Sequence, residues 1–274
     1  MGAEITQKEF KLFQALIYEE TGISLHDKKA TMVQARLSKR LRELQLKSFG
    51  EYYDYLKGGD DGEEMLKLLN AISTNVTAFF REAAQWDFLE EYFSELEQHR
   101  PDKKLRIWSA ASSSGQEPYS IAMFLHEHLK NIAGWDIKLL ATDIDTNMLG
   151  RAIKGIYSEK DVTGMPKKFL TNYFDKINAK EGALYQIKSY LRQMVMYRMF
   201  NLTRGDFTIF KNQFDIIFCR NVMIYFDTPT RNQLISRFHK MLRPGGLLLL
   251  GHSESITQNS GEFKLVQSAI YRKI

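Results

Sequence analysis

The chain has 274 residues, 44% of them hydrophobic and 12% aromatic, so it can bury a sizeable core in one large domain or two. This composition excludes a disordered chain, and the longest purely aliphatic run, Leu247–Leu250, is far too short for a membrane span. No apolar signal segment opens the chain, and a single cysteine, Cys219, excludes an internal disulfide. We therefore expect a cytoplasmic protein that does not insert into membranes.

The net charge of +5 is modest but unevenly distributed. Basic residues exceed acidic ones between Ser24 and Lys47, and the balance reverses from Glu51 to Glu64. Such a local excess predicts an acidic partner for the N-terminal part rather than a general affinity for polyanions. The basic residues of the first stretch are Lys28, Lys29, Arg36, Lys39, Arg40, Arg42 and Lys47.

Apolar residues recur at helical spacing through the first 72 residues, and no strand pattern interrupts them. Thr21-Gly22 is expected to end the first helix, and Gly58-Gly59 the third. Residues 1–72 are thus predicted to form a small all-α domain. Its four helices are marked by Phe10, Phe13 and Ile17, by Val33, Leu37, Leu41 and Leu44, by Tyr52, Tyr55 and Leu56, and by Met65–Ile72.

Residues 73–81 are expected to be a linker that contributes to the site, and residues 82–274 a second domain. After a helix that contains Trp86 and Phe93, strand and helix patterns alternate, which predicts an α/β fold with a doubly wound, mostly parallel sheet. The segment 160–193 fits the alternation poorly and is interpreted as an insertion, whereas the tail 263–274 is expected to add two strands, one of them antiparallel. The expected strands are 105–110, 137–142, 194–200, 214–219 and 246–250, and the helices are 118–130, 147–154 and 229–241.

The segment LRIWSAASSSGQEPYSIA, residues 105–122, is the most informative in the chain. Small residues between a strand and a helix let backbone N–H groups approach a ligand, as in dinucleotide-binding turns. The motifs GxGxxG and GxxxxGK[ST] are absent here, and Glu117 would repel a pyrophosphate. A ligand with an adenosine end and a cationic, amine-bearing end fits better, and S-adenosylmethionine is such a molecule.

Two carboxylates are candidates for binding this ligand. Asp143 follows an expected strand, where it could accept hydrogen bonds from both ribose hydroxyls. The alternative is that it caps the next helix, a role for which Asp145 competes. Glu117 is expected to contact the ligand ammonium, or else to be a first-turn carboxylate that the helix dipole favours.

Further polar residues follow the later strands. Asn201 could present its amide to an adenine edge, and Arg220-Asn221 follows a buried strand directly. His252 and Glu254 are possible site residues after the last parallel strand. No metal site is expected, because His126 and His128 lie two apart on a helix and therefore diverge.

Five ordered motifs together resemble the CheR family of chemotaxis receptor methyltransferases. Members of this family move a methyl group from S-adenosylmethionine to receptor glutamates and release S-adenosylhomocysteine. The motifs are TNVTAFFRE (74–82), WSAASSSGQEPYSIA (108–122), ATDID (141–145), CRNVMIYF (219–226) and LRPGGLLLLGHSE (242–254).

The resemblance implies roles for individual residues. Arg81 and Tyr225 would flank the reacting centre; alone, they would be interpreted as a solvated helix residue and a packed aromatic. It also implies an inserted β-subdomain at about residues 165–195, which some members use to bind a tethering peptide of the receptor. The implied cofactor contacts are Asn75, Thr77, Arg81, Glu117, Asp143, Asn201, Leu202, Arg220 and Asn221.

The expected partner is a methyl-accepting chemotaxis receptor, whose methylated region is an acidic helical coiled coil. Arg36 and Arg40 are one helical turn apart and Lys39 is adjacent, so this row is predicted to dock on such a helix. The alternative is an ordinary solvated face. We expect a monomer, since one site per chain needs no second copy.

Two other classes of function stay open on the residues alone. The basic helix would suit a nucleic-acid methyltransferase, but no (D/N)PP(Y/F) element stands where Arg220-Asn221-Val222 lies. A protein that binds the adenosyl ligand without turnover is the second alternative. Arg81 and Tyr225 together argue against it.

Overall fold

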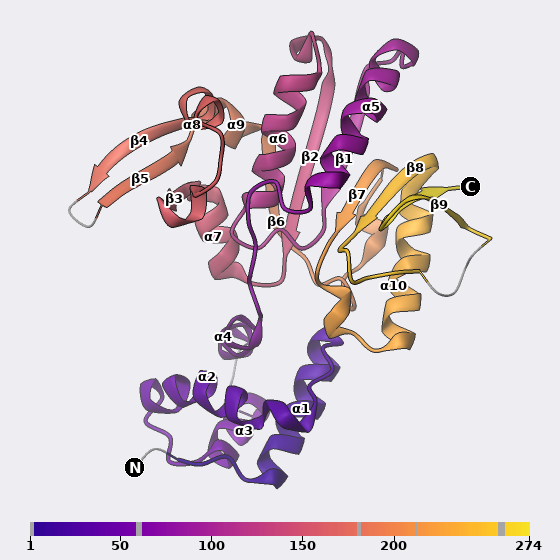
Figure 1. Ribbon diagram of the computed structural model, residues 1–274. Coiled ribbons are helices and arrows are strands. Elements are labelled where there is room, and N and C mark those ends of the chain that lie inside the picture. Colours follow the sequence, from indigo (N-terminus) through magenta and orange to yellow (C-terminus); the bar gives the residue numbers. More distant parts are fainter. Residues whose placement is uncertain (1–2, 59–61, 180–181, 212, 257–260) are drawn as a thin grey trace.

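The computed structural model describes residues 3–58, 62–179, 182–211, 213–256 and 261–274. It consists of a small helical domain joined by an extended segment to a larger α/β body (Figure 1). Gly59, expected to help end the third helix, and Asp60 and Asp61 of the acidic stretch lie outside the described residues. Within the described ranges, no helix combines the length and the apolarity that crossing a membrane requires.

The helical domain contains the four helices that the apolar spacing predicted. Each turns its apolar stripe inward, so that Phe10, Phe13, Leu37 and Tyr52 are fully buried in one core. The first helix begins at a capping box in which Thr6 and Glu9 bond each other's backbone, and it ends at Gly22 in the left-handed conformation. The helices are α1 (Gln7–Thr21), α2 (Ala30–Glu43), α3 (Phe49–Gly58) and α4 (Glu63–Ile72).

The larger body is a seven-stranded sheet with strand order β6-β2-β1-β7-β8-β10-β9. All its described pairings are parallel except those of β10, which is antiparallel to both neighbours. This confirms the predicted doubly wound fold. The strands are β1 (Lys104–Ser109), β2 (Asp136–Asp143), β6 (Val195–Met199), β7 (Phe214–Cys219), β8 (Leu242–Leu250), β9 (Phe263–Gln267) and β10 (Ile270–Lys273).

Alternate residues of the central strands feed two separate cores, one on each face. Ile216 and Phe218 pack with the helices of one face, whereas Trp108 and Ile217 pack with Phe238 on the other. This alternation is why the central strands read as continuous apolar runs. The first face is covered by α5 (Ala83–His99), α6 (Gln116–His128) and α7 (Thr146–Lys154), and the second by α10 (Thr228–Met241).

A second, three-stranded antiparallel sheet stands beside the main body, with strand order β3-β5-β4 (Figure 1). Its first strand precedes the range 165–195 expected for the insert. Tyr157 and Phe174 of this sheet pack around Phe79, so the small sheet is fastened to the segment that joins the two domains. The elements are β3 (Ile156–Ser158), α8 (Lys167–Tyr173), β4 (Phe174–Ala179), β5 (Gly182–Ile187) and α9 (Ser189–Met194).

Candidate active site

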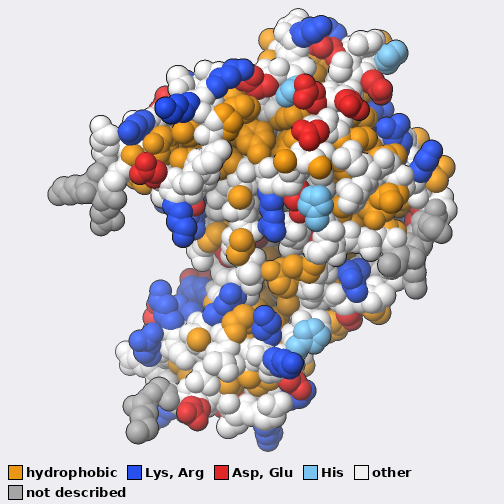
Figure 2. All heavy atoms as spheres, viewed as in Figure 1, with side chains coloured by type: hydrophobic (Ala, Val, Ile, Leu, Met, Phe, Trp, Pro, Cys, Tyr) orange, Lys and Arg blue, Asp and Glu red, His pale blue; other side chains and the backbone are white. Residues whose placement is uncertain are grey.

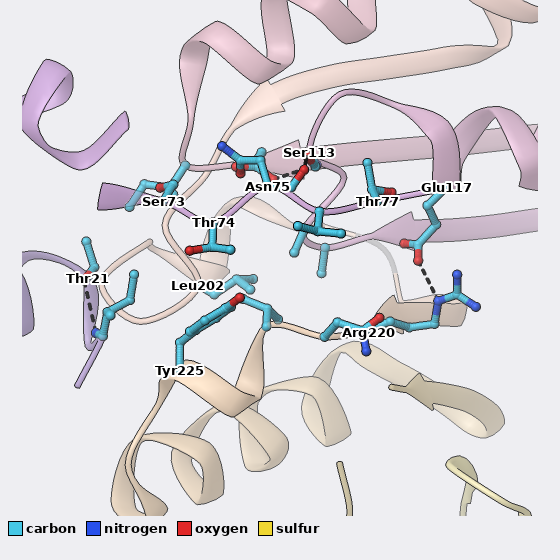
Figure 3. A pocket seen from close by; sticks show the side chains of 18 of the residues that line it. Thr21, Ser73, Thr74, Asn75, Thr77, Ser113, Glu117, Leu202, Arg220 and Tyr225 are labelled. Atoms are coloured by element: carbon cyan, nitrogen blue, oxygen red, sulfur yellow. Dashed lines mark hydrogen bonds and ion pairs between the residues drawn. The ribbon is translucent and has the colours of Figure 1, made fainter. Parts of the chain in front are cut away.

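A pocket with an empty volume of about 890 Å³, part of it open to solvent, lies where β1, β2, β6 and β7 end (Figure 3). The strand order reverses between β1 and β7, and open α/β sheets bind ligands at such a point. All the residues named as cofactor contacts line it, together with Tyr225: Asn75, Thr77, Arg81, Glu117, Asp143, Asn201, Leu202, Arg220 and Asn221.

The turn after β1 brings backbone close to the ligand space. Ser113 and Gly115 have φ of 47° and 96°, a left-handed conformation that only glycine adopts freely. A Cβ at Gly115 would lie 2.8 Å from the Cβ of Ala152 and 2.9 Å from the hydroxyl of Tyr157. Glycine at this position therefore lets the turn pack against α7 and the small sheet.

Asp143 is the last residue of β2 and is 8% exposed. Its two oxygens accept hydrogen bonds from the backbone N–H of Ser113 (2.7 Å) and of Asp145 (2.9 Å). Burial raises the pKa of its carboxyl above the ordinary value. The helix cap is Asp145, which accepts from the N–H groups of Asn147 and Met148, so the capping alternative does not apply to Asp143.

Glu117 forms a buried ion pair with Arg220, at 2.7 Å between Oε2 and Nε (Figure 3). The other Glu117 oxygen accepts from the hydroxyl of Ser109. Glu82 lies 3.8 Å from the same guanidinium, so two carboxylates surround one cation. Glu117 is therefore both a first-turn carboxylate of α6 and part of the pocket wall. The two carboxylates, Glu117 and Glu82, outnumber the one cation, Arg220, and this excess negative charge suits a cationic ligand.

Arg81 and Tyr225 both line the pocket and are partly exposed. Arg81 donates to the carbonyl of Val76 at 3.2 Å and is flanked by Phe80 and Glu82, whose φ values of 48° and 64° are positive. With Ser113 and Asn221, these are four of the seven non-glycine residues with positive φ in the described part of the chain. Strained backbone of this kind is concentrated at functional sites.

The helical domain forms part of the pocket, which the sequence did not indicate. Thr21 and Ile23, at the end of α1, line it, and the N–H of Ser24 donates to the carbonyl of Tyr225 at 2.8 Å. Ile23 also forms a β-bridge with Phe226. Thr21-Gly22 carries only a helix-stop signal, and no local pattern says what a helix end will pack against.

The amide of Asn201 is engaged within the protein. Its oxygen accepts from the N–H and hydroxyl of Thr203 and from the N–H of Arg204. Its nitrogen donates to the carbonyl of Glu20 at 2.7 Å. Asn201 thus borders the pocket and also ties β6 to the helical domain, and the contact of its amide with an adenine edge stays a prediction.

The predicted docking row is likewise not a free surface. Arg36 donates to the carbonyls of Ile72 (2.6 Å) and Ser73 (2.9 Å), and Arg40 pairs with Glu64, whose side chain is only 3% exposed. Lys39, with its side chain 73% exposed, alone extends into solvent. The spacing placed these residues correctly on α2, but α4 packs against that face and engages both arginines.

Two family models together match almost the entire chain. "CheR methyltransferase, all-alpha domain" matches residues 8–73, and "CheR methyltransferase, SAM binding domain" matches residues 75–272. Among similar curated proteins is a "Chemotaxis protein methyltransferase 2" of Vibrio cholerae serotype O1, 39% identical over 260 residues, which cover 94% of this chain and 89% of that protein. The "Chemotaxis protein methyltransferase" of Escherichia coli strain K12 is 38% identical over 268 residues, covering 97% and 91%. The chain has an all-α domain, a doubly wound body and a pocket at the point where the strand order reverses between β1 and β7. It belongs to the CheR methyltransferase family.

Proposed function

We propose that this protein transfers a methyl group from S-adenosylmethionine to glutamate side chains of chemotaxis receptors, with S-adenosylhomocysteine as the second product. The names of its relatives support a role in chemotaxis. The observation that carries the proposal is the pocket itself, in which two buried carboxylates and a buried guanidinium lie beside Arg81 and Tyr225. This set can bind a zwitterionic adenosyl ligand and an anionic acceptor together.

The residues of the pocket fit S-adenosylmethionine. Asp143 can accept from ribose hydroxyls, since it lines the pocket and a carboxylate has about four lone-pair sites for hydrogen bonds. Glu117 and Arg220 match the amino and carboxylate groups of the methionine end, and Leu202 offers an apolar surface. When bound, this cosubstrate supplies a methyl group on a positively charged sulfur.

The acceptor needs no base from the protein. A glutamate carboxyl has an unperturbed pKa near 4.3, so at neutral pH it is already the nucleophilic carboxylate. The work left to the protein is to desolvate this group and to orient it. Arg81 can orient it by paired hydrogen bonds, and Tyr225 provides a hydroxyl and an aromatic face. Thr21 and Ile23 help to close the pocket against water.

We propose that the helical domain docks on the receptor through its solvated basic side chains. Figure 2 shows Lys and Arg gathered on this domain beside a hollow that separates it from the small sheet. Lys28, Lys29, Lys39 and Arg42 are exposed, whereas Arg36 and Arg40 support the domain from within. A glutamate-rich receptor helix has the complementary charge.

The function is tested by incubating the protein with a receptor signalling fragment and S-adenosylmethionine labelled in the methyl group. We expect label on the receptor that base releases as methanol, the signature of a glutamate methyl ester. Label on added DNA or RNA instead would support a nucleic-acid methyltransferase, and binding without any turnover would support a sensor.

The roles of Arg81 and Tyr225 need separate variants. Arg81→Ala and Tyr225→Phe should lose turnover while they still bind S-adenosylhomocysteine, and Tyr55→Phe on α3 serves as a matched control for the loss of a tyrosine hydroxyl. Full turnover in either site variant would refute its catalytic role.

A further inference from the structure

Glu254 is a buried carboxylate just outside the pocket, in the turn that follows β8, and is 6% exposed. It accepts three backbone hydrogen bonds, from the N–H groups of Gly251 (2.6 Å), Asn221 (2.8 Å) and Ile224 (3.2 Å). Two of these donors belong to the loop that follows β7. One side chain therefore joins the ends of two neighbouring strands.

The loop after β7 has a conformation that needs external support. Asn221 lies in the left-handed region with φ of 58°, which is unfavourable for a residue with a Cβ. Four residues later, Tyr225 lies in the pocket wall, at the end of a short 3₁₀ turn, Met223–Tyr225. Glu254 bonds the N–H groups of Asn221 and Ile224, and so holds both ends of the stretch that positions Tyr225.

The fit between the two turns leaves no spare room. A Cβ at Gly251 would lie 2.4 Å from Nδ2 of Asn221 and 2.8 Å from the Glu254 carboxylate. Glu82 adds a second link, because its Oε1 accepts from the N–H of His252 at 3.2 Å and from Nδ2 of Asn221 at 3.4 Å. The loop after β7 and the turn after β8 are therefore packed directly against each other.

We infer that Glu254 is a positioning residue for methyl transfer: it fixes the Asn221–Tyr225 loop in the conformation that presents Tyr225 to the pocket. Glu254 itself does not line the pocket, and it acts through the backbone of the two residues it holds. A carboxylate suits this role because both its oxygens only accept hydrogen bonds. The inference rests on the proposed function.

The test is Glu254→Gln in the full-length protein, assayed with the receptor fragment. Glutamine keeps the shape but replaces one acceptor oxygen by an NH₂ group that faces a backbone N–H, so the loop loses part of its support. We expect kcat to fall about tenfold, the equivalent of one lost hydrogen bond to a charged group. The dissociation constant of S-adenosylhomocysteine should rise by a smaller factor than kcat falls, because Glu254 holds only Asn221 among the implied cofactor contacts and leaves Glu117, Arg220 and Asp143 untouched.

Asp215→Asn is the matched control. Asp215 lies on the same strand, β7, but at its other end; it is 1% exposed, accepts from the N–H of Arg106 at 2.6 Å and is also paired with Arg100 and Arg243. This variant should lower the melting temperature while the folded protein keeps the wild-type kcat.

If Glu254→Gln also lowers only the melting temperature, or leaves kcat unchanged, the inference is wrong while the function stands. If the wild-type protein itself places no base-labile methyl groups on the receptor, the proposed function fails, and this role fails with it.

Discussion

Truncation of Arg36 to alanine should destabilise the helical domain, because its guanidinium holds the end of α4. The hydrogen bonds to the carbonyls of Ile72 and Ser73 are 2.6 and 2.9 Å long, whereas the third, to Ala71, is stretched to 3.4 Å. A hydrogen bond to a charged group contributes roughly 1.5–3 kcal/mol. Since water can reach the half-buried Ser73 after truncation, we expect a loss of about 2–3 kcal/mol in the free energy of unfolding.

The measurement is urea unfolding followed by far-UV circular dichroism, with Lys39→Ala as the control. The Lys39 side chain is 73% exposed, so its truncation should change stability by less than about 0.5 kcal/mol while it raises KM for the receptor. If Arg36→Ala is as stable as the wild type but has a raised KM for the receptor, Arg36 contacts the receptor. Its proposed role in stabilising the helical domain is then refuted.

Three further predictions concern the pocket. Arg220→Met leaves Glu117 buried without its partner, so urea unfolding should show a loss of about 3–5 kcal/mol, and a loss below about 1 kcal/mol would contradict the ion-pair argument. Gly115→Ala, at φ of 96°, should weaken S-adenosylhomocysteine binding about tenfold in calorimetry, because the new methyl group collides with Tyr157; wild-type affinity would disprove this. Burial raises the pKa of Asp143, so the folded protein binds more protons than the unfolded chain, and stability without ligand falls as pH rises through the folded pKa. Asp143→Asn should remove the fall in the free energy of unfolding that Asp143 causes as pH rises. If the free energy of unfolding of this variant depends on pH as in the wild type, the raised pKa of Asp143 is contradicted.

The elements with strong periodicity were predictable from the chain alone. The expected strands 105–110 and 214–219 correspond to β1 and β7 within one residue at each end, because their apolar runs are bounded by turn residues. β8 begins at Leu242 rather than at 246, and its register with β7 shifts between Phe214 and Ile216. β3 was missed, since three residues carry too little pattern to be distinguished from a loop.

The sequence by itself determined the doubly wound fold and which polar residues follow the strands. Parallel strands bring their carboxyl ends to one edge, so Glu117, Asp143 and Arg220 meet there whatever the details of packing. Only the tertiary structure decided which side chains stay available to a partner. Arg36, Arg40 and Asn201 looked free because the hydrogen bonds that join each of them to another element span 24 to 181 residues of sequence. Such contacts depend on how one element packs on another, and the spacing of residues along the sequence does not predict this packing.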